Sequence, residues 1–320
     1  MKKVFSNHKD IFLDIKKINS NNFNVYLIIG PQGIGKYSYA KKIAQFYFCE
    51  DLNKPCGKCL NCCKIREYNH PDLIIIKPKN TPNNSLSISE AREIRRLANL
   101  SSHSGGYQIF IIHQAEKLTI EAQNALLKTL EEPTQKSVFI LTTSNENLIL
   151  PTILSRCQKI RLKISSQKQI KNKLKNYDLK NEEIDMISRF ATGRPKMAIK
   201  LAKNKNLIKE IFEQFKEIKN SVKNKNIFKR FEKAENLQKT QKAPELFEFF
   251  EIFFRDLVHI KIGSDKFLIN FWDKEDLLAI SKNFTFEDLL GIIRNIEKIK
   301  IGCSQNLNLK FAIENLMLEI

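Results

Sequence analysis

A single glycine-rich segment limits this chain to a small set of folds. The apolar run Val25–Ile29 has the length and β-branched content of a buried strand. Directly after it, Gly30-Pro-Gln-Gly-Ile-Gly-Lys36 has the spacing of a phosphate-binding loop, and a helical pattern continues from about Tyr37 to Phe48. Glycines let such a loop wrap around phosphate oxygens, and the positive end of the following helix adds attraction. The segment therefore predicts a strand, loop and helix of the P-loop type.

Further apolar runs extend this unit into a layered domain. Strands are predicted at Leu73–Ile76, Ile109–Ile112, Val138–Thr142 and Lys159–Leu162, with helices from Ser89 to Leu100 and from Thr119 to about Glu132. Near-continuous apolar strands that alternate with helices indicate an α/β fold with a parallel sheet. After about Ser165 the strand signals fade, and apolar residues recur at helical spacing. We therefore expect a P-loop domain over residues 1–165, a small helical lid domain over 166–205 and an all-α C-terminal domain over 206–320.

The phosphate loop keeps its glycines but not all of the residues that surround magnesium–nucleotide. The residue after Lys36 should be Ser or Thr, whose hydroxyl holds Mg²⁺, but here it is Tyr37. Ser38 comes one position late, and one residue turns a helical side chain by about 100°. The candidate nucleotide contacts are Gly30, Gly33, Gly35, Lys36 and Ser38. Two interpretations stay open: weak binding of ATP or ADP, and a loop kept only for the fold.

The acids of hydrolysis are also missing. P-loop NTPases carry an Asp after a second apolar strand to hold Mg²⁺, and in ATPases of this broad type a Glu follows it. Here the strand ends in His113 and Gln114, and we expect Glu116, two positions later, to point elsewhere. Imidazole is a poor ligand for a hard cation, and a carboxamide cannot act as a general base. The sequence therefore predicts no intrinsic ATP hydrolysis.

Four closely spaced cysteines predict a metal site. Cys49, Cys56, Cys59 and Cys62 offer four thiolates in an insert over residues 49–63, which is the number that tetrahedral Zn²⁺ requires. A closed four-cysteine site leaves no position for water, so the predicted role is structural. Cys63 competes with Cys62, but the regular spacing favours Cys62. Cys157 and Cys303 stand alone and are expected to be buried fillers, and the alternative for the cluster is a set of reduced thiols.

The net charge is strongly positive. Lys and Arg number 54 against 35 Asp and Glu, which gives +19. Such an excess favours contact with a polyanion, although a Lys-rich solvated surface explains it equally well. No run of about 18 apolar residues predicts a membrane helix. The first ten residues lack the apolar stretch of a signal peptide, so we expect a cytoplasmic chain without a membrane partner.

Longer strings now carry a family resemblance. His70-Pro-Asp72 follows the cysteine cluster, Asn124–Pro133 reads NALLKTLEEP, and Pro151–Cys157 reads PTILSRC. Together they closely resemble the clamp-loader subunits of bacterial DNA polymerase III, of the AAA+ superfamily, most tightly over residues 24–165. The likeness is looser through Gly193-Arg-Pro195, and it returns over Asn306–Leu318. The resemblance implies a RecA-like AAA+ domain, a lid and a collar domain that joins subunits into a ring.

Two subunit types share these motifs. The gamma/tau type is an ATPase motor, and the delta-prime type has a degraded nucleotide site. The departures at Tyr37, His113 and Gln114 favour the delta-prime type, with gamma/tau as the alternative. A delta-prime subunit would work with gamma/tau and delta subunits to load the sliding clamp onto primed DNA. This chain would then lack ATPase activity, while the holoenzyme as a whole is a nucleotidyltransferase.

The resemblance also implies a role for one arginine. In this family a Ser-Arg-Cys motif supplies an arginine finger to the ATP of a neighbouring subunit, which maps to Arg156. A guanidinium there would neutralise charge that develops in the transition state. The alternative is an arginine that forms a salt bridge at a domain edge. Arg194 matches the region of the family's lid arginine and is expected to be structural. A free-standing, zinc-stabilised nucleic-acid-binding protein without ring partners remains a second rival.

Overall fold

The computed structural model describes residues 4–5, 24–78, 85–133, 136–223, 243–303 and 308–320. The chain divides into two compact units, the first comprising residues 1–170 and 193–197, and the second residues 171–192 and 198–320. Each unit is described separately below. The domain boundaries given above, including the one at residue 205, remain predictions. None of the described helices is long and apolar enough to span a membrane.

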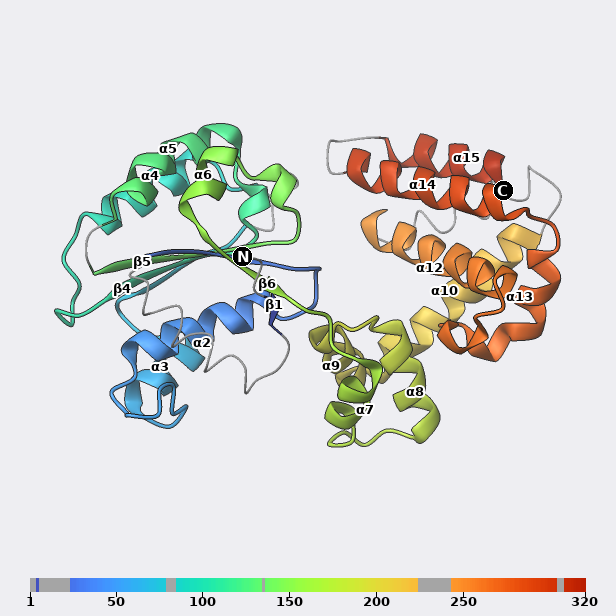
Figure 1. The fold of residues 1–320 in the computed structure, drawn as a ribbon, viewed down its shortest axis with the longest axis horizontal. Coiled ribbons are helices and arrows are strands. Elements are labelled where there is room, and N and C mark those ends of the chain that lie inside the picture. The colour runs from blue at the N-terminus through green and yellow to red at the C-terminus, as the bar shows by residue number, and fades with distance from the viewer. Residues whose placement is uncertain (1–3, 6–23, 79–84, 134–135, 224–242, 304–307) are drawn as a thin grey trace. The chain divides into compact units, whose positions relative to one another are not determined.

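The first unit is built on a parallel sheet of six strands (Figure 1). The strands follow the order β1 (Val4–Phe5), β6 (Gln158–Leu162), β2 (Val25–Ile29), β5 (Ser137–Thr143), β4 (Gln108–Ile112) and β3 (Leu73–Ile76). The predicted α/β class and the five predicted strands are confirmed, whereas the short β1 was not expected. Because β2 lies between β5 and β6, the loop that follows it opens at the carboxyl edge of the sheet, where ligands of such sheets bind.

Alternate residues of each strand face opposite helical layers. Tyr26 and Ile28 pack with α2 (Lys36–Phe48) and with Ile65 of α3 (Leu60–Glu67). Val25 and Leu27 pack on the other face, with α4 (Ile88–Ala98), α5 (Ile120–Glu131) and α6 (Pro151–Arg156). Burial on both faces explains why the strands are apolar without alternation.

The helices predicted from Ser89 and Thr119 begin within one residue of those positions, at Ile88 and Ile120. Ser87 caps α4 in a capping box with Glu90, and the Thr119 side chain accepts from the backbone N–H of Ala122 at the start of α5. Helix α3 was not expected, because its residues fall partly within the cysteine-rich insert. It begins at Leu60, directly after the cap residue Cys59.

The second unit is helical. Its elements are α8 (Asn181–Phe190), α9 (Pro195–Lys203), α10 (Lys205–Lys223), α12 (Ala243–Lys261), α13 (Lys274–Ser281), α14 (Phe286–Cys303) and α15 (Leu309–Glu319), with α7 (Gln167–Leu174) and the start of α9 at the border between the units. The apolar residues expected at helical spacing form core on α12, since Phe250, Phe253 and Phe254 are almost fully buried. On α10 the buried face is less complete, because Phe212 is 37% exposed and packs against Trp272. Residues 201–242 hold 12 Lys and Arg against 5 Asp and Glu, and residues 224–242 of this basic segment lie outside the described residues.

Candidate functional site

The phosphate loop has the backbone that its glycines predict. Gly33 and Gly35 have φ values of 80° and 106°, a region that residues with a Cβ rarely enter. The Lys36 side chain is buried and folds back into the loop, where its Nζ donates to the carbonyl oxygens of Gly30 at 2.6 Å and Pro31 at 3.0 Å. Burial lowers the pKa of Lys36 to about 8. The predicted lysine is therefore in place, with its charge directed at the loop's own carbonyls.

The Gly-Arg-Pro segment closes over this loop. The backbone N–H of Lys196 donates to the Gly33 carbonyl at 3.1 Å, and a Cβ at Gly33 would lie 3.7 Å from that of Arg194. Gly193 has a φ of 79°, and a Cβ there would come within 2.7 Å of Ile164. Only glycine fits at this bend. Arg194, expected to be structural, thus lies against the phosphate loop.

The two sequence positions at which active P-loop enzymes carry their magnesium ligands hold aromatic rings that pack together. Tyr37, at the start of α2, is 8% exposed, and its ring centroid lies 5.0 Å from that of His113 at the end of β4. His113 Nδ1 shares a hydrogen bond with Thr142 Oγ1 at 3.0 Å, and the same hydroxyl accepts from the Gln114 N–H at 3.1 Å. The hydroxyl and carboxylate ligands of a metal are thus replaced by a phenol and an imidazole that pack together.

His113 is held neutral by its surroundings. Burial lowers its pKa to about 4, opposed by Glu116 and reinforced by the positive charges of Lys36, Lys77 and Lys196. Imidazole is a poor ligand for Mg²⁺, a hard cation that prefers oxygen, so His113 does not replace the missing carboxylate. Gln114 has a φ of 57° and begins the short helix Ala115–Lys117.

The expectation that Glu116 points away from the site is wrong. Its Oε1 accepts from the backbone N–H and the hydroxyl of Ser144, which follows β5. Its carboxylate also opposes the lowering of the Lys36 pKa, so the two charges are close enough to interact electrostatically. The turn at Gln114 brings this carboxylate back toward the loop. Counting residues from the end of β4 does not reveal this position, because the turn changes the direction of the chain.

The four predicted cysteines come together. The sulfur atoms of Cys49, Cys56, Cys59 and Cys62 all lie within 4.8 Å of one another, and those of Cys49 and Cys59 are 3.9 Å apart. A tetrahedral site with metal–sulfur bonds of about 2.3 Å requires sulfur atoms about 3.8 Å apart. The cluster, here called the cysteine knuckle, could therefore hold one metal ion.

Backbone donors prepare the knuckle for negatively charged sulfurs. The N–H groups of Lys58 and Cys59 donate to Cys56 Sγ at 3.4 and 3.2 Å and lower its pKa to about 7. The burial of Cys62 raises the pKa of that thiol instead. A positive ion would favour thiolates at all four positions.

The remaining cysteines do not belong to the knuckle. Cys63 directs its sulfur toward the carbonyl of Lys58 at 3.5 Å. Cys157 is buried, as expected, and burial raises its pKa to about 12. The side chain of Cys303 lies outside the described residues.

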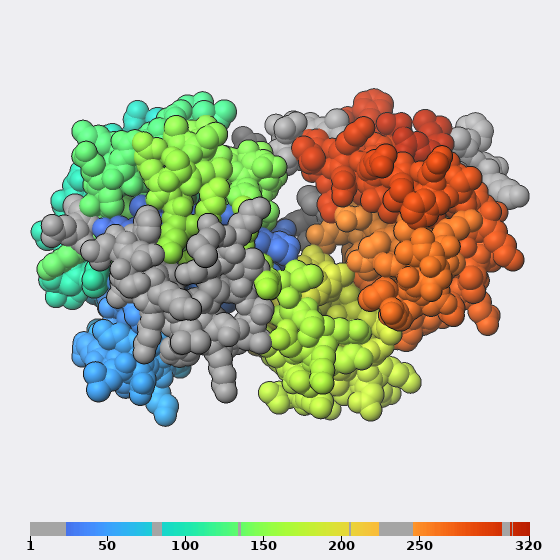
Figure 2. Space-filling view, viewed as in Figure 1, coloured from blue at the N-terminus to red at the C-terminus, as the bar shows by residue number. Residues whose placement is uncertain are grey.

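The knuckle is fastened to the α/β core by hydrogen bonds. Gln45 Nε2 on α2 donates to the Cys62 carbonyl at 2.9 Å, and Asn61 Nδ2 donates to that of Phe48 at 3.0 Å. Helices α2 and α3 therefore hold the segment as a projection from the surface of the first unit (Figure 2).

Arg156 lies at the end of α6 and is paired within the chain. Its NH1 donates to the Thr152 carbonyl at 2.6 Å, and its NH2 forms an ion pair with Glu131 at the end of α5. About one third of the side chain is exposed. The buried Gln123 positions this helix, because its amide bonds both the Leu148 carbonyl and the Leu150 N–H. Sequence reasoning identified Arg156 but not its partner Glu131.

Three lysines beside the loop were also missed. Lys77 follows β3, and its Nζ lies 4.8 Å from the Tyr37 ring centroid, while Lys196 Nζ lies 5.8 Å from the same centroid. Lys41 Nζ is 4.2 Å from the ring of Tyr68. Since the carboxyl ends of parallel strands meet at one edge of the sheet, the position of Lys77 after a strand was a usable signal.

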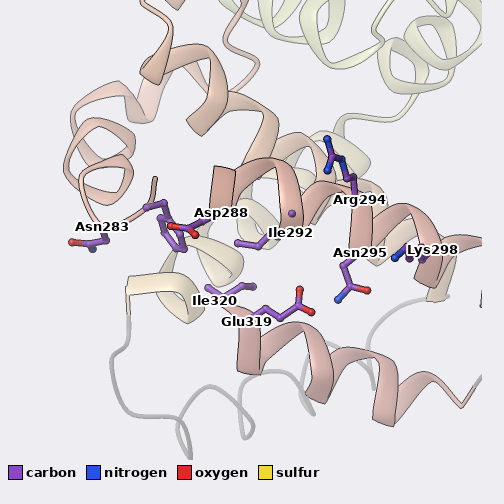
Figure 3. A pocket seen from close by; sticks show the side chains of 10 residues that line it. Asn283, Asp288, Ile292, Arg294, Asn295, Lys298, Glu319 and Ile320 are labelled. Carbon is purple, nitrogen blue, oxygen red and sulfur yellow. The ribbon is translucent and has the colours of Figure 1, made fainter. Parts of the chain in front are cut away.

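A separate cavity lies within the second unit. It has a volume of about 620 Å³ and lies between α14 and the end of α15, where Asn295 and Glu319 extend toward the same space (Figure 3). Its lining includes the acid Asp288 as well as the cations Arg294 and Lys298. Because these charges are mixed, the cavity favours a phosphate ligand less than the loop in the first unit does.

Comparisons with known proteins point to one family. Residues 10–166 match the model of a family described as DNA polymerase III, delta subunit. The DNA polymerase III subunit delta′ of Bacillus subtilis is 27% identical over 92% of this chain and 90% of that protein. The delta′ subunit of Haemophilus influenzae is 32% identical over 54% of this chain and 53% of its own length.

Other relatives carry the names of motor subunits. The tau subunit of Bacillus subtilis is 40% identical over 45% of this chain, which spans only a quarter of that protein. A gamma subunit-related protein of Thermotoga maritima is a solved structure with 16% identity and a TM-score of 0.48 over 97% of this chain and 98% of that one. The family match and the delta′ relatives agree with the degraded magnesium site, and the chain belongs to the DNA polymerase III clamp-loader family, as a member of its delta-prime type.

Proposed function

We propose that this chain is a delta-prime subunit that supports clamp loading without hydrolysing ATP itself. It would assemble with gamma/tau and delta subunits in the cytoplasm and help to load the sliding clamp onto primed DNA. The delta′ relatives support this proposal, as does the net charge of +19, which suits work beside a polyanion.

The observation that carries the proposal is the contact between Tyr37 and His113. The two rings lie 5.0 Å apart, and the imidazole is bonded to Thr142 and held neutral. The imidazole has no oxygen, and burial raises the pKa of the Tyr37 phenol, so neither ring offers the charged oxygen ligand that Mg²⁺ prefers. Glu116, whose charge acts on the loop lysine, accepts hydrogen bonds from Ser144 through Oε1, and Gln114, at the position of the usual base, cannot take a proton from water.

Arg156 is the residue by which the subunit would act on a neighbour. Its guanidinium is partly exposed, and its ion pair with Glu131 joins two surface side chains. Such a pair contributes only about 0–1 kcal/mol, so exchanging the carboxylate for a phosphate is energetically easy. The alternative, an arginine that only joins α5 to α6, predicts that its removal leaves the neighbour's ATPase activity unchanged.

The test is a clamp loader reconstituted with this chain. Arg156→Ala should lower DNA-stimulated ATP hydrolysis by the assembly by about tenfold or more, as losses of arginine fingers do elsewhere. Lys128→Ala, a charge removal on the exposed face of α5, is the matched control. Unchanged ATPase and clamp loading in Arg156→Ala would refute the arginine-finger role.

An active gamma/tau-type ATPase is the rival function. It requires turnover by the isolated chain that disappears in Lys36→Ala. Phosphate release measured with and without primed DNA decides between the two, and turnover at a motor-like rate would overturn the delta-prime assignment.

We also propose that the cysteine knuckle holds one structural zinc ion. The four sulfur atoms already lie near tetrahedral spacing, and the site has no fifth donor among the described residues that would suit another metal. Elemental analysis of the purified protein should give about one zinc per chain. Metal-free protein of the same thermal stability would rule this out.

A further inference from the structure

The Arg156 side chain is held by three contacts within the first unit. Its NH1 donates to the Thr152 carbonyl at 2.6 Å and to the Ser155 hydroxyl at 3.3 Å, and its NH2 forms an ion pair with Glu131. Thr152 and Ser155 lie on α6 itself, whereas Glu131 is the last residue of α5. Of the three partners, Glu131 alone is charged and comes from another helix.

Glu131 occupies a position where a carboxylate is unfavourable for its own helix. The carboxyl end of a helix carries partial negative charge, which repels an acid and attracts a base. Glu132 follows directly as the helix cap, so two acids meet at this end of α5, with Lys128 as the base of the last turn. Arg156, in contrast, lies at the end of α6, where its charge is favoured. The local helix does not explain an acid at position 131, whereas the ion pair with Arg156 does.

Helix α6 is held against α5 without this ion pair. The two helices lie side by side in the first unit, and Ile153 of α6 belongs to the same buried core as Leu126 of α5 (Figure 1). The buried Gln123 of α5 also accepts from the Leu150 N–H at 2.8 Å, just before α6 begins. Removing the charge of Glu131 should therefore free the guanidinium without displacing the helix.

The ion pair occupies the group that a phosphate would bind. A guanidinium contacts a carboxylate and a phosphate through the same N–H donors, so the two anions compete for it. A ligand that needs a free group binds more weakly in proportion to the fraction of that group that is already occupied. Exposed ion pairs are weak, and both Arg156 and Glu131 are partly exposed, so the pair should reduce the apparent affinity by at most about fivefold.

We propose that Glu131 is a positioning residue that holds Arg156 in a resting place and competes for its guanidinium with the phosphates of a neighbouring subunit's nucleotide. The proposal rests on the arginine-finger role proposed above and adds the regulation of that role. Without nucleotide in the neighbour, the guanidinium stays on Glu131. When nucleotide binds there, NH2 exchanges the carboxylate for a phosphate oxygen, while NH1 keeps the Thr152 carbonyl. Glu131 thus sets the nucleotide concentration at which the finger engages.

The test uses a clamp loader reconstituted with the full chain and measures ATP hydrolysis with primed DNA over a range of ATP concentrations. Glu131→Gln keeps the size of the side chain and removes its charge, so the half-saturating ATP concentration should fall by about two- to fivefold with unchanged kcat. Glu132 is exposed and forms no ion pair within the described part of the chain. Glu132→Gln is therefore the matched control and should shift neither value, and melting curves check that each variant is folded.

A double variant separates competition for Arg156 from any other effect of the charge. In the Arg156→Ala background, Glu131→Gln should leave the remaining hydrolysis unchanged, because the residue on which it acts is absent. An unchanged half-saturating concentration in Glu131→Gln, an equal fall in Glu132→Gln, or a fall that persists in the Arg156→Ala background would overturn the proposal.

The same set of variants separates this proposal from the arginine-finger role on which it rests. If Arg156→Ala alone lowers hydrolysis while Glu131→Gln has no effect, the finger stands and only the role of Glu131 fails. Failure of the finger itself would show as unchanged hydrolysis in Arg156→Ala alone.

Discussion

The phosphate loop and the cysteine knuckle lie at the two ends of one helix, and only the knuckle has a complete set of metal-ligand atoms. Helix α2 begins at Lys36 in the loop and ends at Phe48, next to the first knuckle cysteine. The knuckle keeps all four of its ligand atoms within 4.8 Å of one another. The loop keeps its glycine backbone and its lysine, while Tyr37 and His113 replace the groups that would hold a metal.

The difference shows that the fold can require the backbone of a binding loop even where the residues that would hold a metal are absent. Gly33, Gly35 and Gly193 are required by positive φ values and a close approach of chains, whether or not a nucleotide binds. The four cysteine ligands have no such role apart from binding. A closed metal site that loses one thiolate has an incomplete ligand set. The knuckle should therefore tolerate little change at its cysteines, whereas the loop should tolerate change at its metal-ligand positions but not at these glycines.

The largest expected effect comes from a knuckle ligand. Cys59→Ser should reduce metal content from about one ion per chain to nearly none, since a structural zinc site needs all four donors. The melting temperature of the first unit should fall by about 10 °C or more because metal binding is coupled to folding. Elemental analysis and calorimetric scans measure both quantities.

The matched control is Cys63→Ser, which removes a neighbouring thiol that points toward the Lys58 carbonyl. It should leave metal content and melting temperature unchanged. Equal losses in Cys59→Ser and Cys63→Ser would contradict the ligand assignment.

A second change would return the missing ligands to the loop. The double variant Tyr37→Thr and His113→Asp provides a hydroxyl and a carboxylate where metal ligands are expected, and Lys36, Lys77 and Lys196 would help to keep the new carboxylate charged. Nucleotide affinity should then rise by about tenfold on adding Mg²⁺, unlike that of the parent chain. Calorimetric titrations with and without EDTA measure the difference, and the absence of any Mg²⁺ effect would mean that the loop has lost more than its ligands.

The neutral imidazole of His113 makes the loop region sensitive to acid. Its folded pKa of about 4 lies below its ordinary value of 6.5, so the unfolded chain binds more protons between these values. The stabilisation is therefore full above about pH 6.5 and is lost as the pH falls toward 4. The loss should amount to about 1–2 kcal/mol once partial solvent screening is allowed for.

The measurement compares melting curves at pH 7 and pH 5 for the parent chain and His113→Asn, which cannot take up the proton. The fall in melting temperature should be smaller in the variant. An identical fall in both proteins would assign the acid sensitivity to other groups.

The smallest expected effect is at Ser38. Its side chain is turned by about 100° from the position of Tyr37, so Ser38→Ala should change nucleotide affinity by less than about twofold. Titration with ADP in Mg²⁺ measures it. A large, Mg²⁺-dependent loss would make Ser38 a substitute for the missing hydroxyl and would bring the loop closer to an active one.

The sequence determined most of what depends on local pattern. Apolar strands of the right length predicted the sheet, because strands buried on both faces must be apolar throughout. Glycine and cysteine spacing predicted the loop and the knuckle, because few other residues can take those backbone angles or bind a metal in that way. Motif positions likewise identified Arg156. They also identified His113 and Gln114 as the residues that replace the two acids of hydrolysis.

Only the tertiary structure decided which residues from distant segments meet. The pairing of Arg156 with Glu131, the return of Glu116 toward Lys36 and the gathering of Lys41, Lys77 and Lys196 around two tyrosines join positions far apart in the chain. Charged side chains of this kind carry no periodic signal, and their neighbours are set by the order of strands and by the turns between them. A one-residue turn such as that at Gln114 redirects a side chain without leaving a pattern that the sequence alone makes visible.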